Sequence, residues 1–66
     1  MCQAHVFVVQ GEKEEEVMRD VILVEQLPQG VRMHTFFEEP RTIAGGQVLT
    51  IDLLKHIVRV KVEEEK

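Results

Sequence analysis

The sequence alternates short runs of strand-forming residues with turn residues, and no window keeps the period of a helix. The run "IVRVKV" at 57–62 alternates apolar and polar side chains, as expected for a strand with one buried face. In "VRMHTFF" at 31–37, Val31, Met33 and Thr35 share one face. Such segments, rich in β-branched residues, predict an all-β protein.

Turn residues divide the rest of the chain into further strands. Gly45 and Gly46 interrupt a long strand-like segment, as residues of a bend or bulge that curls a sheet. The spacing predicts a small closed or half-open barrel of five to seven short strands, of the SH3 or OB kind. The other predicted turns lie near Gly11, at a kink around Arg19 and Asp20 that separates two strands, and at "LPQG", "EEPR" and "LKH".

The length of 66 residues allows one domain. We assign residues 1–62 to this barrel and 63–66 to an acidic tail. A chain of this size buries only about 60% of its unfolded surface, so it often needs a staple, a metal or a partner chain. One cysteine excludes an internal disulfide and agrees with a reducing cytoplasm. No apolar stretch of about 18 residues is present, so no membrane span is expected.

The charge balance disfavours nucleic acid as a partner. Twelve acidic residues face eight basic ones, for a net charge of −4. Nucleic-acid binders gain much of their affinity from clustered basic groups, whereas the densest group here is Arg59 with Lys61. Only three phenylalanines are available to stack on a base. A small RNA-binding barrel is the alternative function, although the composition disfavours it.

Two segments are apolar on both faces, "VFVV" at 6–9 and "VILV" at 21–24. A half-solvated antiparallel strand would show polar residues at every second position. A second copy of the chain would cover the extra apolar faces, so we predict a homodimer with Phe7 and Val9 as the main contacts. The alternative is a bent central strand that the chain's own loops cover.

The single cysteine is residue 2. If Met1 is removed, Cys2 carries an amine and a thiol that together close a five-membered chelate ring on a metal ion. Two such ends across a two-fold axis supply two nitrogens and two sulfurs, which suits Ni(II) or Cu(II) in a plane and Zn(II) in a tetrahedron. If Met1 stays, its amine, the Cys2 amide nitrogen and the thiolate serve instead. The alternative is that Cys2 is incidental, in a plain interaction module.

Three histidines could add an imidazole ligand. His5 is the best candidate, because a curled terminus would bring its ring to a metal at Cys2. His34 is predicted on a strand surface and His56 at a turn. A catalytic Cys–His pair would need a shaped pocket, an oriented base and an oxyanion site, which a first residue on a small barrel does not offer. We therefore predict no enzymatic activity and no catalytic residues.

Four stretches, "MCQA", "DVILVE", "VRMHTFFEEP" and "TIDLLKHIV", together resemble the CooT family of small nickel-binding accessory proteins. The resemblance spans nearly the whole chain. It implies a small SH3-like β-barrel, a homodimer, and one Ni(II) held between the subunits with Cys2 as the essential ligand. It further implies a metallochaperone or nickel store for a nickel enzyme such as carbon monoxide dehydrogenase, with that enzyme or other maturation factors as partners. Members have also been described as RNA-binding, which the acidic balance does not support.

Overall fold

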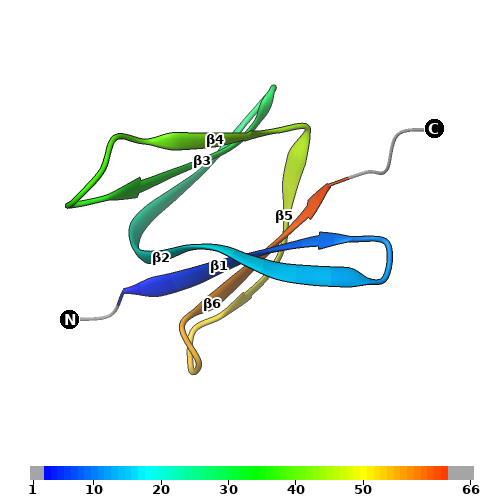
Figure 1. Ribbon diagram of the computed structural model, residues 1–66, viewed down its shortest axis with the longest axis horizontal. Helices are drawn as coiled ribbons and strands as arrows, with labels where there is room; N and C mark the ends of the chain where they lie inside the picture. The colour runs from blue at the N-terminus through cyan, green and yellow to red at the C-terminus, as the bar shows by residue number, and fades with distance from the viewer. Residues whose placement is uncertain (1–2, 63–66) are drawn as a thin grey trace.

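The computed structural model describes residues 3–62, which form six strands and, within that range, no helix. The strands curl into a half-barrel (Figure 1). This confirms the prediction of a small all-β barrel with five to seven strands. The strands are β1 (Ala4–Gln10), β2 (Lys13–Leu27), β3 (Gly30–Thr35), β4 (Arg41–Ala44), β5 (Gly46–Asp52) and β6 (Ile57–Val62).

All six strands belong to one sheet, in the order β4-β3-β2-β1-β6-β5. β1 is central, antiparallel to β2 and parallel to β6, so the first and last strands lie side by side. The edge strands β4 and β5 are joined directly through Gly45, which has a φ of 74°. That left-handed conformation favours glycine, and the sharp corner here turns the sheet back on itself. The predicted break at Gly45 and Gly46 is confirmed.

β2 is one bent strand of 15 residues. The predicted kink exists, because Asp20 has a φ of 60° and the register with both neighbours shifts around it. The prediction of two separate strands is wrong, since the bulged residues bend the strand without ending it. Residues 13–20 pair with β1 and residues 21–27 pair with β3.

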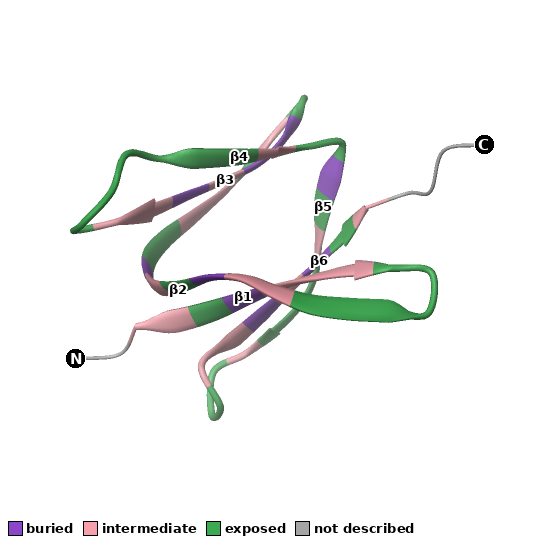
Figure 2. Cartoon of the chain, viewed as in Figure 1, coloured by how far each residue is buried: buried purple, intermediate pink, exposed green. Residues whose placement is uncertain are grey.

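The core is formed by side chains from β1, β2, β3 and β6 (Figure 2). Val31 and Met33 are both buried, which confirms the predicted inward face of β3. Five of the seven core side chains are valines and two are methionines, and β-branched valine is favoured in strands. The buried residues are Val6, Met18, Val21, Val31, Met33, Val58 and Val60.

The carboxamide of Gln26 closes the barrel between β2 and β5. Its Nε2 donates to the carbonyl oxygens of Gly46 and Gly30 at 3.2 Å, and its Oε1 accepts from the Val48 N–H at 2.9 Å. The side chain therefore supplies the hydrogen bonds that a neighbouring strand would otherwise give to β5. We call the contacts of Gln26 with β5 the seam. Next to it, Gly30 permits the close approach of β3 to β4, because a Cβ there would stand 2.1 Å from the Ile43 carbonyl oxygen.

The outer face of β1 is partly covered within one chain. Phe7 lies in register with Glu16 on one side and Arg59 on the other. Two ion pairs flank it, His5 Nδ1 with Glu16 Oε2 at 2.9 Å and Arg59 Nε with Glu14 Oε2 at 2.8 Å. Phe7 and Val9 are accordingly half-buried. The homodimer and its contacts at Phe7 and Val9 stay a prediction, and the most exposed apolar side chains lie elsewhere.

Candidate metal-binding end of the barrel

The start of β1 lies between the bend of β2 and the turn that precedes β6 (Figure 1). Ala4 is in register with Val21, and the His5 N–H donates to the His56 carbonyl oxygen at 2.9 Å. Cys2, the predicted main ligand, lies outside the described residues together with the terminal amine. Their role as ligands stays a prediction. Residues 3–62 show what surrounds this end of the barrel.

His5 lies on the outer face of β1, opposite to the side on which Ala4 packs against the core. Its Nδ1 forms a hydrogen bond with Glu16 Oε2 at 2.9 Å, and within residues 3–62 its Nε2 makes none. Metal-binding histidines commonly use one nitrogen for the metal and the other for a carboxylate, which fixes the tautomer and the ring. His5 therefore has the arrangement of a ligand that would bind through Nε2.

Glu16 is held as a carboxylate by its surroundings. The hydrogen bond with His5 lowers the pKa of the Glu16 carboxyl, the charges of Arg19 and His5 lower it further, and partial desolvation opposes them without reversing the shift. The Nε of Arg19 lies 3.5 Å from Glu16 Oε2. The ionised carboxylate is the form that orients a histidine and raises its basicity as a ligand.

The other two histidines do not gather around His5. His34 lies on β3 and its Nε2 pairs with Glu25 Oε1 at 2.8 Å. His56 has a φ of 59° in the predicted turn and meets His5 through the backbone. Across the part of the chain that the structure describes, no three His, Cys, Asp or Glu side chains could hold a metal together. A tight site at this end would therefore need the terminal donors, a second chain, or both.

Exposed apolar side chains flank the start of β1 on both sides. Leu53 and Leu54, in the turn between β5 and β6, are 79% and 89% exposed. Ile22 and Leu23, just past the bend of β2, are the other members, and we call these four residues the apolar rim. Single exposed apolar side chains are common on protein surfaces, and these four matter here because they lie on both sides of the start of β1.

The turn that carries the two leucines has a defined shape. Asp52 Oδ1 accepts from the N–H groups of Leu54 at 3.1 Å and Lys55 at 2.9 Å. Such side-chain acceptors stabilise a tight turn, so the leucines are presented on an ordered backbone.

Glu16, Leu53 and Leu54 were not predicted from the sequence. The signal for Glu16 is the two-residue turn at Gly11 and Glu12, which pairs Gln10 with Lys13. Counting back along that hairpin sets Phe7 opposite Glu16, one diagonal step from His5.

Half of the rim did have a signal in the sequence. The segment 21–24 is apolar on both faces, and Ile22 and Leu23 of this segment are exposed in the structure. Their proximity to the turn with Leu53 and Leu54 depends on the tertiary structure.

These observations define a small half-barrel with one ordered histidine–carboxylate pair beside its N-terminal end. The fold is similar to that of the crystal structure of a protein assigned to CooT from Carboxydothermus hydrogenoformans, with a TM-score of 0.80 over 96% of this chain and 100% of that one, at 24% identity. The family described as "CO dehydrogenase accessory protein CooT" matches residues 1–61. The chain belongs to the CooT family. A comparison with curated proteins finds no match.

The family assignment confirms the resemblance seen in the sequence. Members of this family are accessory proteins of carbon monoxide dehydrogenase, so the chain has an accessory role in the maturation of that enzyme. The residues that the structure describes contain no helix able to span a membrane.

Proposed function

We propose that the protein binds Ni(II) as a carrier or store for the maturation of a nickel enzyme such as carbon monoxide dehydrogenase, and that it catalyses no reaction. The observation that carries this proposal is the family match over residues 1–61, which includes Cys2. We place the protein in the cytoplasm, where a single thiol stays reduced and able to bind metal. The nickel ion is cargo here and leaves with the client enzyme.

The ligands are the Cys2 thiolate and a terminal nitrogen of each of two chains. The amine titrates near pH ~8 and the thiol near ~8.5, so a metal ion displaces both protons readily at neutral pH. Adjacent nitrogen and sulfur donors close a five-membered ring, and two rings complete a planar set of two nitrogens and two sulfurs. This soft donor set suits Ni(II) and Cu(II) better than a carboxylate set does.

The apolar rim supports a shared site. Contact between the rims of two chains would bury leucines that now face water, and each buried leucine contributes about 1.5–3 kcal/mol. Because the rim flanks the start of β1, a two-fold axis through it would bring the two N-terminal ends together. The homodimer would then form without metal and present both thiols to one ion.

His5 is the additional ligand in this scheme. Its Nε2, which forms no hydrogen bond within residues 3–62, could take a coordination position when an ion enters or leaves, with Glu16 holding the ring. Copper binds most such donor sets more tightly than nickel, so selectivity in the cell depends on metal supply and on the docking partner.

A nickel titration followed by ultraviolet–visible absorption tests the proposal, with untagged protein because an upstream tag would convert the amine to an amide. We expect a thiolate-to-nickel charge-transfer band that saturates at one nickel per two chains and weakens below about pH 6, where protons compete for both donors. Cys2→Ser should abolish the band and tight binding, whereas the control His34→Gln should bind as the unmodified chain does. Unchanged affinity in Cys2→Ser would contradict the proposal.

A further inference from the structure

The first half of β2 has one unpaired edge. Residues 13–20 pair with β1, while β3 joins β2 only from Val21 onward. In an antiparallel strand, every second residue directs its N–H and C=O groups away from the partner. Along residues 13–20 these groups therefore point to the side where no strand lies, which is the geometry that accepts an added strand.

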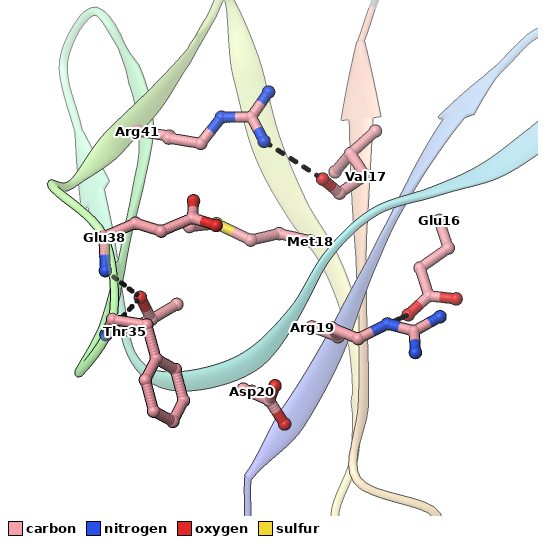
Figure 3. Close-up of a pocket in the computed structure, with 9 residues that line it drawn as sticks. Glu16, Val17, Met18, Arg19, Asp20, Thr35, Glu38 and Arg41 are labelled. Carbon is pink, nitrogen blue, oxygen red and sulfur yellow. Dashed lines mark hydrogen bonds and ion pairs between the residues drawn. The ribbon is translucent and has the colours of Figure 1, made fainter.

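The edge faces a groove of about 290 Å³ (Figure 3). One wall is β2 itself, and the opposite wall is the end of β3 with the loop that leads to β4. We call it the fork groove, because it lies where the two halves of β2 diverge toward different partners. Its lining consists of residues 16–20 and of Thr35, Phe37, Glu38 and Arg41.

Arg41 occupies one hydrogen-bonding position of the free edge. Its Nη1 donates to the Val17 carbonyl oxygen across the groove at 3.3 Å (Figure 3). The bond is long for an N–H donor, and Arg41 is an exposed residue, so a peptide N–H can replace it at little cost. The contact shows that the Val17 carbonyl is directed into the groove and is accessible to a donor from outside the strand.

The opposite wall is ordered and carries an aromatic ring. Thr35 Oγ1 accepts from the N–H groups of Phe37 at 3.1 Å and Glu38 at 3.0 Å, which fixes the start of the loop. The Phe37 side chain is exposed beside the groove. Among the described residues, the carboxylates of Asp20 and Glu38 form no ion pair, and both line the groove.

We propose that the fork groove binds an extended, basic segment of a partner protein, which adds to the free edge of β2 as a further strand. Backbone bonds to β2 would provide the affinity, and alternate side chains the specificity. A lysine or arginine of the segment would lie between Asp20 and Glu38 and over the Phe37 ring, where carboxylates and an aromatic face both attract a cation. The net charge of −4 favours such a partner. This inference is independent of the proposed nickel site.

The test is a nuclear magnetic resonance titration of the full chain with the acetylated and amidated peptide Val-Arg-Val-Arg-Val. We expect the largest amide shifts at Val17, Arg19 and Phe37, and slower hydrogen exchange at the amides of residues 13–20 that point away from β1. The same peptide with alternate backbone nitrogens methylated should not bind, because it cannot pair with β2. Absence of binding, or amide shifts confined to other surfaces, would overturn the proposal. The charged residues along this edge would then serve only to prevent aggregation through strand pairing.

Matched variants test the role of charge. Asp20→Asn with Glu38→Gln should weaken peptide binding about tenfold, as expected from the loss of two partly exposed charge contacts. Asparagine tolerates the positive φ at position 20, so the bend of β2 is kept. The control Glu12→Gln with Glu39→Gln removes the same charge outside the groove. Equal weakening in both pairs, or equal binding of Val-Glu-Val-Glu-Val, would show that the groove does not select a basic segment.

Discussion

The two halves of β2 differ in how they are paired. Residues 21–27 have β3 along one edge and, at Gln26, a side chain that bonds to β5 on the other. Residues 13–20 have β1 along one edge and a groove along the other. Within the described range 3–62, residues 22–27 have no backbone partner on the side of β1, but the Gln26 side chain bridges that side to β5, and we call residues 21–27 the saturated half in this sense. Residues 13–20 are the open half, and the two halves meet at Asp20, where φ is 60°.

The difference separates stability from binding. The saturated half borders the seam and contributes Val21 and Val24 to the core. In the open half, Glu16 forms a hydrogen bond with His5, and the free edge of the strand faces the fork groove. The apolar rim includes Ile22 and Leu23, which lie just past the bend. We therefore expect substitutions in the core and the seam to change the free energy of unfolding, and substitutions in the rim or along the open half to change association.

The largest effect is expected from Met33→Ala in the core beside the saturated half. Met33 is 1% exposed, and removing such a side chain costs about 2–5 kcal/mol of unfolding free energy, which is a large fraction of the stability of a small domain. Urea denaturation followed by circular dichroism measures it. The control Leu54→Ala, at a side chain 89% exposed, should change the unfolding free energy of the monomer by less than about 0.5 kcal/mol. Similar losses in both variants would remove the distinction between the two regions.

In the turn between β5 and β6, Leu54→Glu tests the apolar rim as the dimer contact. A charge at the interface forfeits the burial of one leucine per chain, about 1.5–3 kcal/mol, so the dimer should dissociate roughly 10- to 100-fold more readily. Analytical ultracentrifugation over a concentration series measures this shift. The matched substitution Leu49→Glu lies outside the rim and should leave the dimer intact. If Phe7→Glu alone produced monomers, the outer face of β1 would be the contact instead.

The seam is tested by Gln26→Leu. This variant removes the partners of the Gly46 carbonyl and the Val48 N–H, so we expect a loss of about 1–2 kcal/mol in unfolding free energy. Gln47→Leu makes the same chemical change on the exposed side of β5 and serves as the control. Thermal unfolding of both variants distinguishes them, and equal melting temperatures would mean that the Gln26 carboxamide does not close the barrel.

The smallest effect concerns the pH dependence contributed by Glu16. Because the folded state lowers the pKa of the Glu16 carboxyl below its usual value of 4.5, the ionised group stabilises the fold above that pH. This contribution should disappear as the pH falls from about 4.5 through the folded-state pKa. Glu16→Gln should therefore be less stable than the unmodified chain at pH 7 and converge with it below that window. Parallel stability curves from pH 7 to pH 3 would contradict the assigned contact with His5.

Local sequence patterns predicted the strands well. The alternation at 57–62 and 31–37 gave β6 and β3, and the glycines at 45 and 46 gave the corner between β4 and β5. The continuity of β2 was not predictable, because whether Asp20 ends a strand or bends it depends on the partners on both sides. The parallel pairing of β1 with β6 joins the two ends of the chain, and no local pattern encodes it.

The candidate site was predictable only in part. The predicted role of Cys2 follows from its residue type and position and stays a prediction, because Cys2 lies outside the described residues. The position of His5 on the outer face followed from simple alternation. Its hydrogen bond with Glu16 depends on the hairpin register, and the rim depends on tertiary structure that brings residues 22–23 and 53–54 to the same end of β1.

The proposed function depends on two chains that share one nickel ion through their Cys2 thiolates. Native mass spectrometry of untagged protein, loaded with Ni(II) at neutral pH, tests it most directly, because it counts metal ions and chains in the same particle. We predict a dimer with a single nickel ion, and a metal-free dimer for Cys2→Ser. A monomer that carries its own nickel ion, or a Cys2→Ser dimer that retains the metal, would contradict the account.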